Sequence, residues 1–304
     1  MKQLQSAKAR VFPLAARVYS ELVRRRSTVV VTQASRDDEE IDLGFLIGCF
    51  RSGTTLGRYV IDSHSKIASP GETEFLTSLC GLSGDERSRT ALELMGFDGD
   101  HVRSTIRRHA QYFYSSYGAA KGAELVLDKT PNYVPISNEL GAIFPGARFV
   151  GLHRHPLDQV NSFTRGLSYR PPEIPDRPGE HRSLAQVAGE YWQESTSTMA
   201  AAASALGDRW LDIRYEDLCN DPPEVFAKVF AHLGHDWEPE ALEYWRFPHD
   251  VGFEGGKALG RTEIKLVHGG WQKWDQVDVD TVLRVTADGR QLHGYGQSAL
   301  DGPG

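Results

Sequence analysis

The stretch Leu43–Leu56, which reads LGFLIGCFRSGTTL, decides how the rest of the chain can be interpreted. A short apolar run from Phe45 to Ile47 leads into a loop rich in glycine, serine and threonine, and a helix is expected to follow the loop. Glycines in such a loop let backbone N–H groups turn toward an anion, and the N-terminus of the next helix adds partial positive charge. The stretch therefore predicts a strand, a phosphate-binding loop and a helix, in that order.

The loop differs from the Walker pattern, which has a glycine, four residues, a second glycine, a lysine and then serine or threonine. Gly48 and Gly53 occupy the two glycine positions, and Thr55 occupies the last one. Thr54 stands where the lysine should be, and a cation appears instead at Arg51. We therefore expect a phosphate cradle without the lysine that contacts the β- and γ-phosphates of ATP. The alternative is an ordinary strand-to-helix turn that is rich in Gly, Ser and Thr.

The composition is that of an ordinary globular protein. Of the 304 residues, 40% are hydrophobic and 25% are charged, which suits one large α/β domain or two small ones. A net charge of −7 and an isoelectric point near 5.9 argue against a general nucleic-acid-binding role. The cysteines Cys49, Cys80 and Cys219 are scattered, so neither a disulfide framework nor a zinc site is expected.

Apolar runs and the N-terminal residues lead to expectations about the location of the protein and its domains. No apolar run approaches the ~18 residues that span a bilayer, and no signal-peptide core is recognisable, so a cytoplasmic protein is expected. Residues 1–40 are interpreted as an N-terminal arm and residues 41–304 as a single domain. Residues 1–26 have the pattern of a basic amphipathic helix, which Pro13 should kink. Packing of this helix on the domain or on a partner subunit is favoured over a membrane surface, and a homodimer is left open.

The remaining chain alternates between short apolar runs and helical patterns. Beyond the opening stretch, strands are predicted at 124–127, 147–152 and 210–213. Helices are predicted at 54–63, from Glu72 to Cys80, at 86–96, 100–117, 136–144, after Pro156, at 183–206, from Asp221 onward and at 279–292. This alternation predicts an α/β fold of three layers, in which a parallel β-sheet is flanked by helices on both faces.

Charged side chains follow the ends of the predicted strands. Arg51, Lys129 and Arg154 each come directly after such a strand, and Tyr215 follows the last one. Ligands of open parallel sheets bind at the carboxyl ends of the strands. Three cations converging on one crevice indicate a polyanionic ligand.

Three of these segments resemble the sulfotransferases that use 3′-phosphoadenosine 5′-phosphosulfate (PAPS). CFRSGTTL is similar to the loop of that family that binds the 5′-phosphosulfate, RFVGLHRHPLDQVNSF to its 3′-phosphate segment, and RYEDLCNDP to the segment whose tyrosine lies by the adenine. The resemblance extends over residues 43–292. It is strongest to bacterial-type members and to the related tyrosylprotein sulfotransferases, and it implies the P-loop-like sulfotransferase fold.

The resemblance also implies how the donor would be bound. PAPS would be the donor, 3′,5′-ADP the product, and no metal ion would be required. The residues implied to bind PAPS are Arg51, Ser52, Gly53, Thr54 and Thr55 for the 5′ side, Arg154 and Ser162 for the 3′-phosphate, Tyr215 for the adenine, and Lys265 as a further 3′ contact. Arginine suits a phosphate because its guanidinium group forms two parallel hydrogen bonds.

The catalytic base is implied by the same resemblance. The cytosolic phenol and steroid sulfotransferases carry a histidine base in a Lys-Thr-His segment, but here the corresponding residues are Lys129, Thr130 and Pro131. The bacterial group and the tyrosylprotein enzymes use a glutamate after the loop helix, and SPGETEFL is similar to that segment. Glu72 then falls on the base position, with Glu74 as the alternative. Lys129 and Arg51 would stabilise the leaving group.

The acceptor is the least defined part of this prediction. The loop 166–182 is rich in Pro, Gly and Arg, and long loops of this kind often act as lids. It is expected to cover the acceptor site, although a solvated basic loop explains the same pattern. A phenol or alcohol of small-molecule size is expected as acceptor, and the arginines leave room for an acidic peptide tyrosine or an acidic sugar.

Two rival interpretations remain. A P-loop kinase that uses Mg-ATP on a small molecule would require a lysine at position 54, where the chain has Thr54. A non-catalytic nucleotide-binding module would keep the loop but would have no need of Glu72 or Lys129.

Overall fold

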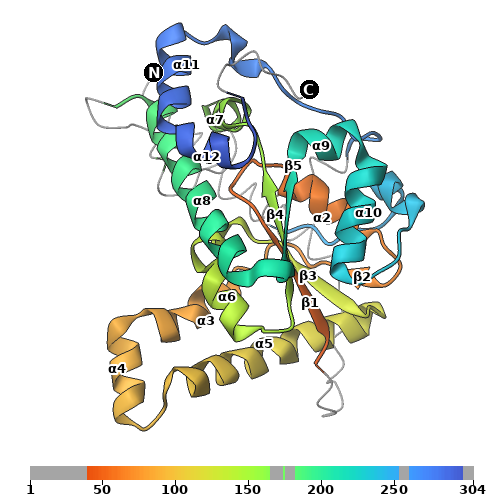
Figure 1. Cartoon of the computed structure of the whole chain (residues 1–304). Coiled ribbons are helices and arrows are strands. Elements are labelled where there is room, and N and C mark those ends of the chain that lie inside the picture. Colours follow the sequence, from red (N-terminus) through yellow and green to blue (C-terminus); the bar gives the residue numbers. More distant parts are fainter. Residues whose placement is uncertain (1–39, 165–173, 175–181, 253–259, 297–304) are drawn as a thin grey trace, which may run out of the picture.

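The computed structural model describes residues 40–164, 174, 182–252 and 260–296, and its centre is a five-stranded parallel sheet (Figure 1). The strand order is β2-β3-β1-β4-β5. The strands are β1 (Asp42–Ile47), β2 (Ile67–Ala68), β3 (Leu125–Asp128), β4 (Arg148–His153) and β5 (Trp210–Arg214). Because every adjacent pair is parallel, the carboxyl ends of all the strands lie at one edge. The predicted parallel α/β sheet is confirmed.

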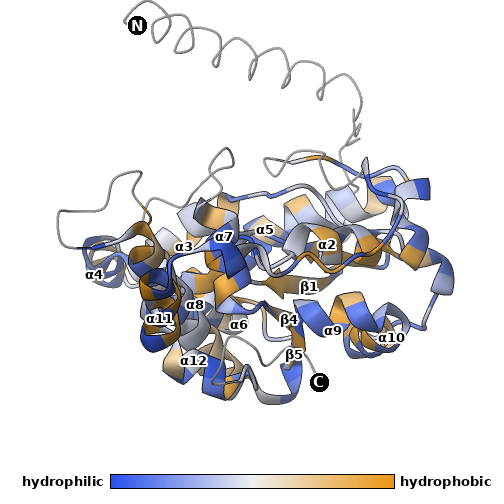
Figure 2. Ribbon diagram, turned by 90° about the horizontal axis from the view of Figure 1, so that it is seen from above, coloured by the Kyte–Doolittle hydropathy of each residue, from blue (hydrophilic) through white to orange (hydrophobic). Residues whose placement is uncertain are grey.

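Helices cover both faces of this sheet. The α-helices are α2 (Thr54–Asp62), α3 (Phe75–Gly84), α4 (Glu86–Leu94), α5 (Gly99–Lys121), α6 (Ser137–Ile143), α7 (Pro156–Thr164), α8 (Leu184–Leu206), α9 (Tyr215–Asn220), α10 (Pro222–Leu233), α11 (Gln276–Val285) and α12 (Ala287–Leu292). Short 3₁₀ helices are η1 (Pro131–Ile136), η2 (Gly207–Arg209), η3 (Pro239–Arg246) and η5 (Gly270–Lys273). Figure 2 shows hydrophobic residues along the strands and on the helix faces beside them.

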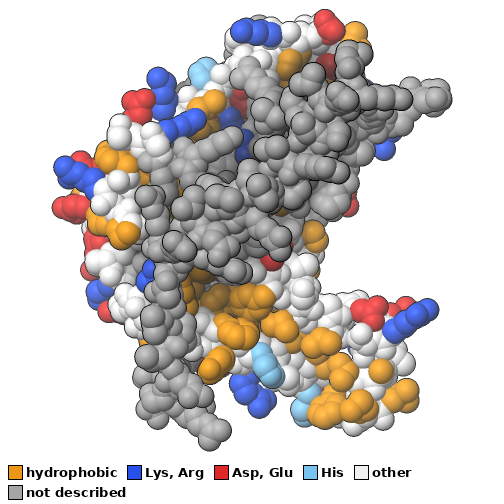
Figure 3. All heavy atoms as spheres, turned by 180° about the vertical axis from the view of Figure 1, so that it is seen from behind, with side chains coloured by type: hydrophobic (Ala, Val, Ile, Leu, Met, Phe, Trp, Pro, Cys, Tyr) orange, Lys and Arg blue, Asp and Glu red, His pale blue; other side chains and the backbone are white. Residues whose placement is uncertain are grey.

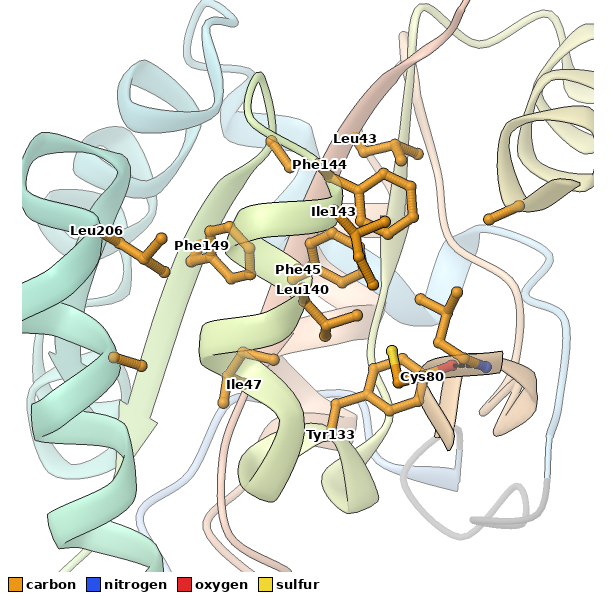
Figure 4. Close-up of a cluster of buried hydrophobic side chains, with 14 of the residues drawn as sticks. Leu43, Phe45, Ile47, Cys80, Tyr133, Leu140, Ile143, Phe144, Phe149 and Leu206 are labelled. Carbon is orange, nitrogen blue, oxygen red and sulfur yellow. Dashed lines mark hydrogen bonds between the residues drawn. The ribbon is translucent and has the colours of Figure 1, made fainter. Parts of the chain in front are cut away.

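The alternation of side chains along β1 divides the core in two. Leu43, Phe45 and Ile47 point to one face, where residues of α3, α5, α6 and α8 pack on them (Figure 4). Leu46 points to the other face, toward α2 and α10. Successive side chains of a strand point to opposite faces, so a strand buried on both faces must be apolar throughout, as the run from Phe45 to Ile47 is.

The sheet register places aromatic rings of the core against each other. Phe45 pairs with Phe149 across β1 and β4, and the two rings stack with centroids 5.1 Å apart. The ring of Trp210 stacks on the far side of Phe149 at 6.0 Å. Figure 4 shows Phe45 at the centre of this cluster, surrounded by residues from β1, β4 and α6.

Two expectations about local structure were wrong. The helix expected to open at Glu72 begins at Phe75, because the backbone at Glu74 takes a φ of 59° and cannot continue a helix. The helix expected at 136–144 is confirmed as α6, and the 3₁₀ helix η1 directly precedes it. The last helix, expected at 279–292, is split at Thr286 into α11 and α12; the Thr286 hydroxyl donates to the Val282 carbonyl at 2.7 Å.

Several predictions concern residues that the structure does not describe. The helix at 1–26 and all of the arm except Glu40 lie outside the described residues, as does the loop 166–182 except Ile174 and Arg182. None of the helices in the described part is long and apolar enough to cross a membrane.

The helices α3, α4 and α5 form a second arm, distinct from the N-terminal arm of residues 1–40, that projects from the sheet (Figure 1). Figure 3 shows hydrophobic side chains gathered on one face of the molecule, including the end of this arm. The exposed large hydrophobic residues of the arm are Leu82, Leu94, Met95, Phe97, Tyr112 and Phe113. A contiguous apolar surface of this kind is typical of an interaction surface. Phe113 also contacts Phe75 edge-on at 5.6 Å, so the apolar surface extends to the start of α3.

The stacked core residue Phe45 provides a test of the packing. Replacing this fully buried ring by alanine, Phe45→Ala, should lower the free energy of unfolding by about 3–5 kcal/mol, because a cavity is left beside Phe149. Tyr112→Ala removes a ring that is 54% exposed and should change it by less than about 0.5 kcal/mol. Urea unfolding of both variants measures the difference, and equal stabilities would contradict the assignment of the core.

Candidate functional site

The carboxyl edge of the sheet carries a buried ion pair. Lys129 follows β3 directly, and its Nζ donates to Glu72 Oε1 at 2.6 Å. The side chains of Lys129 and Glu72 are 0% and 10% exposed. Removing one member of a buried pair leaves an uncompensated charge and typically costs about 3–5 kcal/mol. The structure thus brings together the two residues predicted as base and cationic stabiliser, and it places them out of bulk water.

The second candidate base, Glu74, has a different partner. Both of its carboxylate oxygens accept from Asn132 Nδ2 at 2.8 Å. Glu74 precedes α3 with a left-handed backbone, and this turns its side chain toward η1 rather than toward Lys129. The cation therefore engages Glu72 and not Glu74.

The loop between β1 and α2 is tightly closed. The Ser52 N–H donates to the Cys49 carbonyl at 3.1 Å, and the φ angles of Arg51 and Gly53 are 70° and 106°. A Cβ at Gly48 would lie 2.6 Å from Thr54 and 2.8 Å from the Ser52 hydroxyl, so only glycine fits at this position.

The first turn of α2 is available to a ligand. No side chain caps the helix, whose first residues are Thr54 and Thr55. The Ser52 hydroxyl is buried and has no hydrogen-bond partner among the described residues. An uncapped helix N-terminus next to an unsatisfied hydroxyl is suited to an anion, as expected of a phosphate-binding loop.

Arg51 and Ser162 lie in direct contact. Arg51 Nε donates to Ser162 Oγ on α7 at 2.8 Å, so residues predicted for the 5′ and 3′ sides of the donor are joined. Burial and, to a smaller extent, the nearby charge of Arg154 lower the pKa of Arg51. Two guanidinium groups this close repel each other, and a bound polyanion would relieve the repulsion.

Arg154 and Tyr215 stack against the loop. The guanidinium group of Arg154 lies 4.5 Å from the centre of the Tyr215 ring, and its Nη1 donates to the Arg51 carbonyl at 3.0 Å. The Nε of Arg154 is buried without a partner in the part of the chain that the structure describes. A Cβ at Gly53 would lie only 2.3 Å from the Tyr215 ring. Tyr215 therefore packs between the loop and Arg154.

Lys265 is not drawn into this cluster. Its carbonyl accepts from the Tyr215 hydroxyl at 3.5 Å, but its ammonium group lies 3.9 Å from Glu263 and the side chain is 72% exposed. The structure thus places the backbone of Lys265 near the site and its charge in solvent.

Sequence reasoning missed Arg58, which is fully buried on α2. Its guanidinium group donates to the carbonyls of Ser69, Pro70 and Asp250 at 3.1, 3.1 and 2.8 Å. It thereby ties the helix after the phosphate loop to the segment that leads to Glu72. A charged residue on a helix with an otherwise apolar inner face was the available signal.

The same helix holds these segments at a second point. Asp62 accepts from the Ser69 N–H at 2.6 Å and lies 2.5 Å from His249 Nδ1. The ring of His249 packs on Tyr59 at 4.7 Å. A Cβ at Gly71 would approach the Gly252 backbone to 2.4 Å, so the segments around Gly71 and Gly252 are in close contact.

A cluster of possible metal ligands includes His153, the residue before Arg154. The ligand atoms of His153, Asp212 and His293 all lie within 4.8 Å of one another. However, the rings of His153 and His293 stack with centroids 3.6 Å apart and planes at 24°. Ring-nitrogen lone pairs lie in the ring plane, so nearly parallel rings do not aim at one ion. His153 instead bonds to Asp212 at 2.7 Å, and the arrangement favours a hydrogen-bonded stack.

His155 directly follows Arg154 and precedes α7. Burial lowers the pKa of His155 to about 4, with further contributions from Arg290, Arg214 and Arg154. The ring is therefore neutral at pH 7 and adds no charge beside Arg154. The Glu216 carboxyl group accepts from the His155 N–H at 2.9 Å, and burial raises the pKa of this carboxyl group.

The chain is similar to known proteins over the region that contains most of these residues. The profile of the Sulfotransferase family matches residues 45–239. Nodulation protein NoeE of Sinorhizobium fredii is 30% identical over 66% of this chain and 52% of its own length. Protein-tyrosine sulfotransferase 2 of Gallus gallus is 24% identical over 75% of this chain and 60% of its own length. The chain therefore spans little more than half the length of these two relatives.

Solved structures show the same fold. The sulfotransferase domain from the curacin biosynthetic pathway superposes with a TM-score of 0.55 at 22% identity, covering 84% of this chain and 98% of that domain. The sulfotransferase domain of the Synechococcus PCC 7002 olefin synthase gives a TM-score of 0.57 at 20% identity, covering 87% and 99%.

The buried arginine of α2 can be tested for its role in holding the site. Arg58→Met should lower the free energy of unfolding by at least about 3 kcal/mol, because buried carbonyls lose their donor. Arg89→Met on α4, where the side chain is 51% exposed, is the matched control and should cost less than about 0.5 kcal/mol. Denaturant unfolding gives both values. Equal midpoints for the two variants would show that Arg58 does not hold these segments.

Proposed function

This chain belongs to the sulfotransferase family, and we propose that it transfers a sulfuryl group from PAPS to a hydroxyl acceptor and releases 3′,5′-ADP. The observation that carries this proposal is the buried contact between Lys129 and Glu72 at 2.6 Å. It lies at the same edge of the sheet as the phosphate loop, where Arg51 and Arg154 gather. No metal ion is required in this scheme.

Donor binding is supported by the distribution of positive charge. The 5′-phosphosulfate would occupy the loop, with the N–H groups of Gly53, Thr54 and Thr55 and the hydroxyl group of Ser52 as donors. The 3′-phosphate would bind Arg154 and Ser162, which are both linked to Arg51. Tyr215 would lie beside the adenine. Lys265 would have to turn from Glu263 to reach the 3′-phosphate.

The proposed reaction is an in-line displacement at sulfur. The acceptor hydroxyl gives its proton to the Glu72 carboxylate while its oxygen forms a bond to sulfur. The bond between sulfur and the bridging oxygen breaks, and its electron pair stays on the 5′-phosphate of 3′,5′-ADP. Lys129 and Arg51 would stabilise that developing charge. Lys129 would therefore turn from Glu72 toward the bridging oxygen as the donor binds, and this frees the carboxylate to act as base.

The proposed acceptor is a phenol or alcohol of small-molecule size. The similarity to protein-tyrosine sulfotransferase 2 of Gallus gallus supports a phenolic hydroxyl, and an acidic peptide tyrosine or an acidic sugar is the alternative. The contact between Phe75 and Phe113 lies at the start of α3, which begins three residues after Glu72. It offers an aromatic surface to the apolar part of such an acceptor.

The rival functions are less well supported. A kinase using Mg-ATP would have a lysine where Thr54 lies at the start of α2. A non-catalytic nucleotide-binding module would have no reason to bury Lys129 with Glu72, since burying two charges costs several kcal/mol per ion.

Substitution of the base tests the mechanism. Glu72→Gln keeps the size and a hydrogen-bond acceptor for Lys129 but cannot take up the proton, so the rate of transfer should fall by about 10²–10⁴-fold. The Kd for 3′,5′-ADP should stay close to that of the wild type. Glu74→Gln is the matched control and should retain most activity. If the two variants exchange these results, Glu74 is the base.

A nucleotide panel tests the donor class. Saturating 3′,5′-ADP should raise the Tm by several degrees, because a ligand at 100 times its Kd stabilises by about 2.7 kcal/mol. Mg-ATP should shift the Tm much less, and EDTA should leave transfer unchanged. Arg154→Ala should reduce the shift caused by 3′,5′-ADP more than that caused by adenosine 5′-phosphosulfate. Stabilisation by Mg-ATP alone would instead favour the kinase.

A further inference from the structure

Thr73 lies between the two candidate carboxylates and makes its own contacts with the end of β3. Its hydroxyl donates to Asp128 Oδ2 at 2.7 Å and lies 2.8 Å from the Tyr133 hydroxyl. Its backbone N–H donates to the Thr130 hydroxyl at 3.2 Å. Asp128 is 1% exposed, so water does not compete for the bond between Asp128 and Thr73.

Asp128 is itself held in place from other directions. The Tyr114 hydroxyl on α5 donates to its Oδ2 at 2.5 Å, and the Thr130 hydroxyl donates to its Oδ1 at 3.1 Å. As the last residue of β3, it is also fixed by the sheet, where it pairs with Phe45. The carboxylate therefore acts as a fixed point, and the position of Thr73 follows from it.

Residues 72–74, which precede α3, are joined by side-chain contacts to residues 128–132, at the end of β3 and the start of η1. Three successive residues of one are each held by a residue of the other, at 2.6, 2.7 and 2.8 Å: Glu72 by Lys129, Thr73 by Asp128, and Glu74 by Asn132. Of these contacts, the one to Thr73 is in the middle and is made by a group that takes no part in proton or sulfuryl transfer.

We propose that Thr73 is a positioning residue for the transfer reaction, whose bond to Asp128 sets the position and direction of the Glu72 carboxylate at the carboxyl edge of the sheet. This inference rests on the proposed function, in which Glu72 is the base. Without the bond, Glu72 keeps its partner but occupies a wider range of positions. A displacement of 1 Å at a reacting group can lower the rate by about 10²-fold.

The test compares two near-isosteric side chains. Thr73→Val removes only the hydroxyl and should lower kcat by about 10- to 100-fold, while the KM for PAPS and the Kd for 3′,5′-ADP stay within about twofold of wild type. Thr73→Ser keeps the hydroxyl and should restore kcat to within roughly threefold. Tyr133→Phe removes a neighbouring hydroxyl but leaves the bond between Thr73 and Asp128, and it should behave like Thr73→Ser.

The outcomes separate this inference from the proposed function. A Thr73→Val variant with the kcat of wild type, or a Thr73→Ser variant as impaired as Thr73→Val, overturns the role of Thr73. If Thr73→Val does not fold, Thr73→Ala takes its place in the same comparison with Thr73→Ser. A wild-type protein that transfers no sulfuryl group to any hydroxyl acceptor, or a fully active Glu72→Gln variant, counts against the proposed function instead.

Discussion

The arrangement of the candidate site depends on the buried ion pair between Lys129 and Glu72. Removing two charges from water costs several kcal/mol per ion, and only close contact in a fixed geometry offsets that cost. The fixed geometry comes from the surroundings, because Arg58 holds the carbonyls before Glu72 and β3 fixes the backbone before Lys129. Buried polar contacts from α2 thus help to hold the segment before Glu72 against the end of β3, where Lys129 follows.

Backbone strain is found in the same place. Arg51 and Glu74 are the two non-glycine residues of the described chain with a positive φ, and both lie in the candidate site. Such conformations are costly and persist only where surrounding contacts fix them. At Arg51 these contacts are the bonds to Ser162 and Arg154, and at Glu74 the bond to Asn132. The strain therefore supports a functional role for this edge of the sheet, independently of any sequence resemblance.

The sequence predicted the sheet and the gathering of several polar residues at its carboxyl edge, for a clear physical reason. Strands buried on both faces are apolar throughout, so the run at Phe45 could be recognised, and residues following parallel strands must meet at one edge. The position of Arg58 on an otherwise apolar helix face indicated burial, but its partners could not be predicted because they are backbone carbonyls, which every sequence contains. Glu72 and Glu74 resemble the acidic residues of a first helical turn. In the structure they precede α3 instead, and their carboxylates bind Lys129 and Asn132.

The close approach of Gly53 to the Tyr215 ring limits which side chains positions 53 and 215 of this chain can hold. A Cβ at position 53 would lie 2.3 Å from this ring, and the ring is in turn covered by Arg154 at 4.5 Å. Any side chain larger than hydrogen at position 53 therefore requires a smaller residue at position 215. The two positions, far apart in the chain, therefore constrain each other, and together they link the loop after β1 to the start of α9.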